Sequence, residues 1–182
     1  MATISVEIKE GIAALSKKEL EKLVIKAASK DKSFYNYLFV NYFNKESGEQ
    51  ELHNKTKADL DTLIHKSYRG FSEELQLANM LSACVKRINE FSKVCKNKKF
   101  EVDLIMYVLE IPFSANSNYL GTCFTAFDYK VGLLVKRVIT LLTKKLHPDY
   151  LIQYTQTINQ YLIVLHRTSS HMNLVYSLPK TI

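Results

Sequence analysis

Glycine and proline are scarce in this sequence, with five and three copies among 182 residues. An all-β protein of this length would need many more of these residues, because tight turns depend on them. Hydrophobic residues make up 47% of the chain and charged residues 24%, which are ordinary values for a globular protein. The scarcity of turn residues therefore predicts an all-α fold of long helices joined by few connections.

Long apolar runs are also missing. The longest, at residues 104–109, is far shorter than the roughly 20 residues that a membrane-spanning helix requires. Near the N-terminus, Glu7, Lys9 and Glu10 interrupt any apolar signal core. We therefore expect no membrane span.

Cysteine is limited to three residues, without any C-x-x-C pair. If Cys84 and Cys95 share one helix, they lie about 16 Å apart along its axis. That distance is too long for a disulfide. Cys84 and Cys123 fall on apolar stripes and are expected to be small core residues. Free thiols predict a reducing, cytoplasmic location.

Motifs for common enzymatic chemistry are absent from the sequence. It contains no G-x-x-x-x-G-K-[ST] phosphate loop, no dinucleotide-binding G-x-G-x-x-G, no G-x-S-x-G nucleophile elbow and no zinc-binding H-E-x-x-H. No cofactor is therefore expected, and a non-enzymatic protein is favoured over an enzyme.

Apolar residues recur at helical spacing along most of the chain. Ser16 and Glu19 have the spacing of a capping box and predict a helix start, with a buried stripe formed by Leu20, Leu23, Val24 and Ala27. Asp31 is a suitable cap for a further helix over residues 34–43, although this aromatic run also has strand propensity. The polar residues 44–57 are expected to form a loop around Gly48.

The second half of the chain shows the same helical periodicity. Ser72 predicts a helix start after Gly70, and Pro112 is expected to end a helix that begins near Phe100. A long helix is expected from Leu120 to Leu142. Another begins at residues 147–149, where proline suits the first helical position. The tail from residue 169 is expected to be irregular.

These segments predict seven or eight helices in one domain over residues 1–182. Either a compact bundle or a short irregular stack of helical hairpins fits the pattern.

Positive charge is concentrated in the second half of the sequence. The net charge is +7, and residues 81–182 hold 13 basic and 6 acidic side chains, whereas residues 1–80 hold 12 of each. The basic residues fall within 86–99 and 130–145, and seven-residue spacing places two sets on helical stripes: Lys86 and Lys93, and Lys130, Arg137 and Lys144. These five residues form a candidate surface for nucleic acid or another polyanion. Because lysines outnumber arginines 21 to 4, a solvated surface is the favoured alternative.

Carboxylates and histidines form only weak candidate sites. Glu49 with His53, and Asp61 with His65, are paired at i, i+4, a spacing that surface ion pairs explain as well as metal binding. A further set could line one face of a helix and take part in acid–base chemistry: Asp103, Tyr107 and Glu110. No nucleophile or metal-ligand set accompanies them, so no metal site is expected.

The leading hypothesis from the sequence is a non-enzymatic helical domain that acts by protein–protein contact or self-association. It depends on the missing catalytic motifs and on helices with apolar residues on more than one side. The alternative is a basic helical module that binds nucleic acid or another polyanion through residues 86–99 and 130–145.

Overall fold

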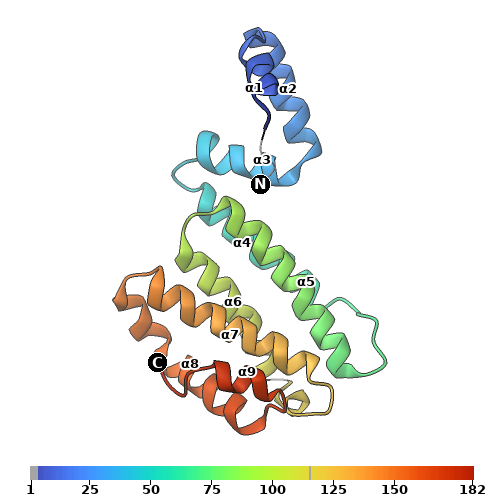
Figure 1. The fold of residues 1–182 in the computed structure, drawn as a ribbon, viewed down its shortest axis with the longest axis vertical. Coiled ribbons are helices and arrows are strands. Elements are labelled where there is room, and N and C mark those ends of the chain that lie inside the picture. Colours follow the sequence, from blue (N-terminus) through green and yellow to red (C-terminus); the bar gives the residue numbers. More distant parts are fainter. Residues whose placement is uncertain (1–3, 115) are drawn as a thin grey trace. The chain divides into compact units, whose positions relative to one another are not determined.

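The computed structural model describes residues 4–114 and 116–182 and confirms the predicted all-α fold. The described residues form nine α-helices, eight of which have seven or more residues, and contain no strand (Figure 1). The helices are α1 (Val6–Ala13), α2 (Lys17–Lys30), α3 (Lys32–Leu38), α4 (Gly48–Ile64), α5 (Glu73–Val94), α6 (Lys98–Phe113), α7 (Ala126–Lys144), α8 (Pro148–Thr168) and α9 (Met172–Ser177). A π-helical turn, η1 (Phe39–Phe43), continues α3, and a 3₁₀ turn, η2 (Ser117–Tyr119), follows α6.

The contacts divide the chain into two compact units, residues 1–48 and residues 49–182. We refer to them as the N-terminal unit and the C-terminal unit and describe each by itself. A single domain over residues 1–182 stays a prediction.

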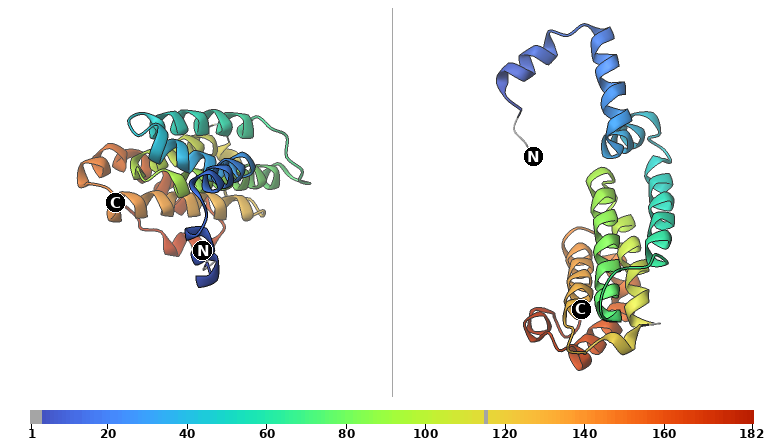
Figure 2. Two further views of the ribbon diagram at one scale, coloured as in Figure 1. Left: turned by 90° about the horizontal axis from the view of Figure 1, so that it is seen from above. Right: turned by 90° about the vertical axis from the view of Figure 1, so that its right-hand side faces the viewer.

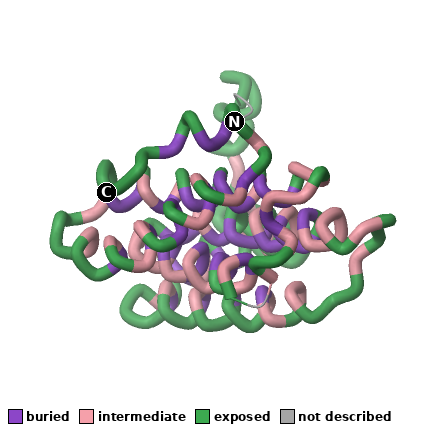
Figure 3. Tube along the Cα trace, turned by 90° about the horizontal axis from the view of Figure 1, so that it is seen from below, coloured by how far each residue is buried: buried purple, intermediate pink, exposed green. Residues whose placement is uncertain are grey.

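The C-terminal unit is built around α7. This helix packs against α5, α6, α8 and α9, and α5 also packs against α6 (Figure 1). The buried residues gather where these helices meet, and the largest fully buried side chains come from α4 to α8 (Figure 3). This unit therefore has a continuous hydrophobic core.

Helix α4 corrects the expected loop over residues 44–57. The helix begins at Gly48, so only residues 44–47 form a turn. Leu52, Thr56 and Leu60 are buried at i, i+4 and i+8, a helical stripe that the surrounding polar residues obscured. Glycine suits the start of α4 because a Cβ at position 48 would lie only 3.2 Å from the Val40 Cα.

The start of α7 is later than the apolar pattern predicted. The helix begins at Ala126 rather than near Leu120, because Gly121 has a φ of 82°, which a right-handed helix cannot contain. The buried Asp128 carboxylate then accepts hydrogen bonds from the Gly121 and Ser170 backbone N–H groups. These contacts hold the segment before α7 against the segment after α8.

Two further expectations about helix ends need correction. Pro112 lies inside α6, and the helix ends one residue later, at Phe113. The Phe113 ring stacks on Tyr161, with centroids 3.9 Å apart. The tail is not wholly irregular, because α9 occupies Met172–Ser177. A Cβ at Gly132 would overlap Leu174, so the glycine in α7 lets α9 pack closely.

Among the described residues, no helix is both long enough and apolar enough to cross a membrane.

Candidate interaction surface

The N-terminal unit has well-capped helices but almost no core. Ser16 and Glu19 form the predicted capping box, and hydrogen bonds from the Ser16 hydroxyl and backbone N–H lower the pKa of Glu19. The Asp31 carboxylate accepts hydrogen bonds from the first turn of α3, which confirms a helix over the aromatic run. Between residues 4 and 48, however, the buried residues are Asn36, Val40 and Gly48 alone.

The expected buried stripe on α2 is wrong, because none of the residues of α2 is buried. Leu23 and Val24 are exposed, and Ile25 is 70% exposed. Large apolar side chains are exposed across the whole unit: Ile4, Val6, Ile8, Ile12, Leu23, Val24, Ile25, Tyr35, Tyr37, Tyr42 and Phe43. Such a concentration on a short segment is typical of an interaction surface.

An apolar groove lies between α2 and the α3–η1 segment. Its volume is about 500 Å³. One wall comes from α2 and the other from α3 and η1, with these lining residues: Val24, Ile25, Ala28, Ser29, Tyr35, Leu38, Phe39 and Phe43. The π-helical turn presents Phe39 and Phe43 beside Tyr35, whose ring stacks on Phe39 at 6.4 Å. We call this feature the α2–α3 groove.

Helix α1 has an exposed apolar stripe. Ile8 and Ile12 lie one turn apart on α1 and therefore occupy one side of the helix. Ser5 caps the helix by accepting a hydrogen bond from the Ile8 N–H. At the connection, α1 turns away from α2 and does not run along it (Figure 2). No residue of α1 is buried.

The predicted basic stripes lie on α5 and α7, which pack against each other. Lys86, Lys93 and Lys144 are exposed, and Lys130 is partly buried beside a small pocket between α5 and α7. The remaining residue, Arg137, differs from these lysines because its guanidinium donates hydrogen bonds to other side chains of the protein. The polyanion-binding surface stays a prediction.

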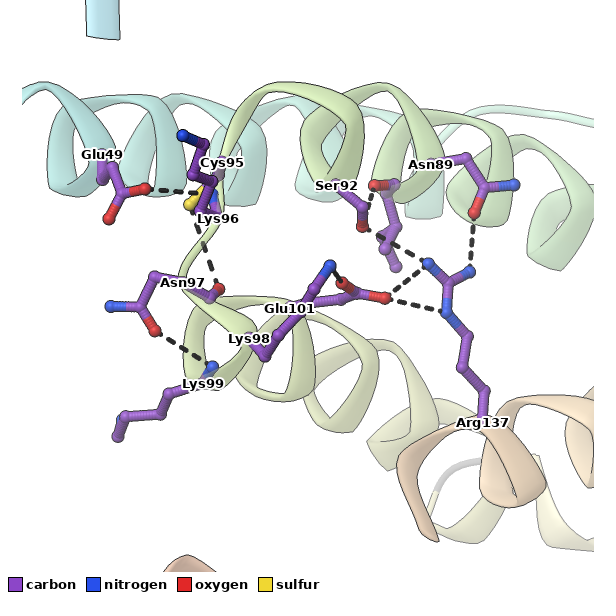
Figure 4. A network of polar contacts seen from close by, with 11 residues as sticks. Glu49, Asn89, Ser92, Cys95, Lys96, Asn97, Lys98, Lys99, Glu101 and Arg137 are labelled. Atoms are coloured by element: carbon purple, nitrogen blue, oxygen red, sulfur yellow. Dashed lines mark hydrogen bonds and ion pairs between the residues drawn. The ribbon is translucent and has the colours of Figure 1, made fainter. Parts of the chain in front are cut away.

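Arg137 is the centre of a polar network that links α5, α6 and α7 (Figure 4). Its guanidinium donates two hydrogen bonds to the Glu101 carboxylate, the shorter at 2.7 Å, and others to Asn89 and Ser92. Lys98 donates to the other Glu101 oxygen at 2.7 Å. Burial alone would raise the pKa of Glu101, but the hydrogen bonds and charges of Lys98 and Arg137 outweigh it and lower that pKa. This geometry favours a structural role for Arg137.

Arg87, another member of the basic segment 86–99, is also an internal cation. It is buried on α5 and donates hydrogen bonds to Asp59 at 2.7 Å and to the Thr56 hydroxyl at 2.8 Å, both on α4. This bridge could not be predicted from the sequence, because 28 residues separate Arg87 from Asp59. Part of the apparent basic patch therefore holds helices together.

The candidate carboxylates of α6 do not converge. Asp103 accepts hydrogen bonds from Lys99 and from Tyr154 on α8, whereas Tyr107 donates to Asp61 on α4. The Asp61 hydrogen bond, with burial, raises the pKa of Tyr107 to about 12. Glu110 is exposed. Side chains that face two different helices do not form a common acid–base site.

The histidine pairs do not form metal sites either. Glu49 accepts a hydrogen bond from the Lys96 backbone N–H at 3.0 Å (Figure 4). The His53 ring instead packs against Phe100, with centroids 4.8 Å apart. His65 contacts the Asp61 backbone carbonyl rather than its carboxylate. In the part of the chain that the structure describes, no group of three or more His, Cys, Asp or Glu residues could hold a metal ion.

All three cysteines are free thiols. Burial raises the pKa of Cys84 to about 11, and burial also raises the pKa of Cys95 to about 12. Both are therefore protonated and unreactive at neutral pH. Cys123 is exposed, which corrects the expectation that it lies in the core. It precedes α7 in the irregular segment around Gly121, where helical periodicity does not apply.

Comparisons of the chain with protein-family models, curated proteins and solved structures return no match.

Proposed function

We propose that this chain is a non-enzymatic helical domain that acts by protein–protein contact through the apolar surface of its N-terminal unit. The observation that carries the proposal is the exposure of eleven large apolar side chains between residues 4 and 48, around the α2–α3 groove. Exposed apolar surface costs free energy in water, and covering it by a partner recovers about 25 cal/mol for each Å² removed from solvent.

The composition of the groove further supports a protein partner. Phe39, Phe43 and Tyr35 supply large rigid contact areas, and aromatic residues are enriched at the centres of protein interfaces. A catalytic role would need convergent polar groups, and the walls of the groove hold only the hydroxyls of Ser29 and Tyr35.

A photoreactive residue in the groove tests this proposal. We would place p-benzoyl-phenylalanine at Tyr35 and, as a matched control, at Tyr176, an exposed tyrosine of α9 in the C-terminal unit. On illumination in cells, adducts with protein are expected at position 35 and not at position 176. The identified adduct partner, once purified, should bind the variant Ile25→Glu at least tenfold more weakly than the wild type.

Equal adduct formation at both positions, or none at either, would contradict the proposal. An adduct with a second copy of the chain and an adduct with another protein would both support it, since each requires the same surface.

We also propose that the protein is located in the cytoplasm. The support for this location is the free state of the three cysteines, including the exposed Cys123, because exposed thiols persist in a reducing compartment. Imaging of a fluorescent fusion is expected to show cytoplasmic signal, and accumulation in the secretory pathway would refute this location.

A further inference from the structure

We propose that the occupant of the α2–α3 groove is helix α1 of a second copy of this chain, so that two copies exchange their first helices. This inference rests on the proposed function, because it names the partner of the same surface. The N-terminal unit contains both an unfilled apolar groove and an apolar helix without a single buried residue. The groove offers an apolar surface that could cover the isoleucines of α1, and α1 offers apolar side chains that could fill the groove.

The shape of α1 suits the groove. Ile8 and Ile12 form one narrow stripe on α1, and they are 57% and 40% exposed. Amphipathic helices that bind in hydrophobic grooves present apolar anchors one turn apart, as Ile8 and Ile12 are. The groove walls are apolar along their length, apart from Ser29 at the end of α2 and the Tyr35 hydroxyl.

Charge complementarity favours the same pairing. Helix α1 contains two glutamates and one lysine, whereas α2 contains five lysines and two glutamates. Glu7 and Lys9 flank the isoleucine stripe, and Lys22 lies beside the part of α2 that lines the groove. A helix with an acidic balance is therefore drawn toward a basic one, although exposed pairs add more to association rate than to affinity.

The length of α1 favours a second copy over closure within one chain. Residues 14–16 connect α1 to α2, so α1 could only fold back antiparallel to α2. With eight residues α1 is about 12 Å long, whereas Ala28 lies about 16 Å from the first residue of α2. Folded back, α1 would end near Val24 and leave Ala28 and the Tyr35–Phe43 wall uncovered. A helix from another copy has no such restriction.

Reciprocal exchange gives a closed twofold dimer, because each copy offers one helix and one groove. Because each contact involves one helix of eight residues, we expect the two together to bury an area at the low end of the roughly 1,200–2,000 Å² of stable interfaces. The expected result is a dimer with a Kd on the order of 10 μM, which depends on protein concentration.

Sedimentation equilibrium of the full chain between about 1 and 500 μM tests dimer formation on both sides of this Kd. The wild type should change from monomer to dimer over this range. Ile8→Glu on α1 and Ile25→Glu in the groove should each weaken the dimer at least tenfold. Ile152→Glu, at a position 77% exposed on α8, is the matched control and should behave as the wild type. All three positions are exposed, and circular dichroism would verify that each variant folds.

A monomer at every concentration overturns the proposal, as does a dimer that persists in Ile8→Glu. The purified chain could stay monomeric while position 35 forms adducts with another protein. This pair of results would refute helix exchange and still support the proposed function.

Isotope labelling identifies the segment that fills the groove. Unlabelled chain with p-benzoyl-phenylalanine at position 8 is mixed with ¹⁵N-labelled wild type and illuminated. The expected adduct joins position 8 to a ¹⁵N-labelled peptide from residues 22–43. With the labelled chain in excess, adducts to unlabelled peptides alone, or to a peptide outside residues 22–43, would contradict helix exchange.

Discussion

The ion pair between Arg137 and Glu101 provides a quantitative test of how the C-terminal unit is held together. The substitution Arg137→Met keeps a long unbranched side chain and removes a charge with four hydrogen bonds. The Glu101 side chain is 5% exposed, so its carboxylate would stay buried with Lys98 as its remaining charged partner.

The expected loss of stability follows from this burial. Removing one partner of a fully buried ion pair costs about 3–5 kcal/mol. The loss here should be smaller, about 2–3 kcal/mol, because Lys98 remains 2.7 Å from the carboxylate and the Arg137 side chain is 28% exposed. Replacing both partners, as Glu101→Leu with Arg137→Met, leaves no buried charge. This double variant should unfold within about 1 kcal/mol of the wild type.

The pH dependence has a definite sign. The pKa of Glu101 is lowered in the folded protein, so the charged form stabilises the fold above the ordinary glutamate pKa of about 4.3. That contribution is lost as the pH falls through the lower folded value. In Arg137→Met the buried carboxylate is more easily protonated, which relieves the unfavourable charge. The cost of the substitution should therefore be largest near pH 7 and shrink below about pH 5.

Urea unfolding followed by circular dichroism at 25 °C measures these differences, since the chain has no tryptophan to report unfolding. A single-variant loss below about 0.5 kcal/mol, the size typical of an exposed pair, would refute the reasoning. So would a double variant that is less stable than Arg137→Met.

Two other predictions concern a backbone position and the lysine stripes. Gly121→Ala should lower the free energy of unfolding by at least about 2 kcal/mol, because alanine disfavours a φ of 82° and its Cβ would lie 2.2 Å from the Thr168 carbonyl oxygen. Gly11→Ala, in open space on α1, is the control for thermal unfolding, and equal losses in both variants would contradict this account. For the lysine stripes, fluorescence anisotropy with labelled DNA and RNA at about 50 and 200 mM salt should show no salt-dependent binding. The opposite result would be tight binding at low salt in the wild type and none in the double variant Lys86→Glu with Lys93→Glu. That result would establish the polyanion-binding surface.

Helix starts were the features most readily predicted from the sequence. Ser16, Asp31, Ser72 and Pro148 all occupy the helix-start positions that their residue types indicated. A cap is a local structure, because a side chain at the first position bonds to a backbone N–H two or three residues away. Everything needed to recognise it lies within one short window of the sequence.

The depth of burial could not be predicted in the same way. Helical periodicity showed that α2 has an apolar face at Leu20, Leu23, Val24 and Ala27, but not which element would cover it. In α5 the same kind of pattern is covered by neighbouring helices, and Leu81 and Ile88 are fully buried. An amphipathic face is therefore a prediction of contact, and only the tertiary structure distinguishes a core from an interface.

The proposed interaction surface could not be predicted from the sequence for a related reason. Its most informative residues, Phe39 and Phe43, lie in a π-helical turn that none of the sequence patterns indicated. The candidate cation Arg137 was placed correctly on a helical stripe, yet its partner Glu101 lies 36 residues earlier. A seven-residue spacing positions a charge on a helix but does not reveal a distant carboxylate that neutralises it.

The two units differ in what stabilises them, and this difference connects stability with function. The C-terminal unit buries a continuous core, whereas the buried residues among positions 4–48 of the N-terminal unit are Asn36, Val40 and Gly48. Capping bonds contribute too little to compensate for a missing core, since they are local and solvent-exposed. A partner that covers the α2–α3 groove adds the missing burial, and any ligand that binds only the folded form stabilises it in proportion to its concentration. The proposed contact therefore predicts a stability of the N-terminal unit that rises with protein concentration in the wild type. In Ile8→Glu, which is expected to fold, this concentration-dependent gain should be absent.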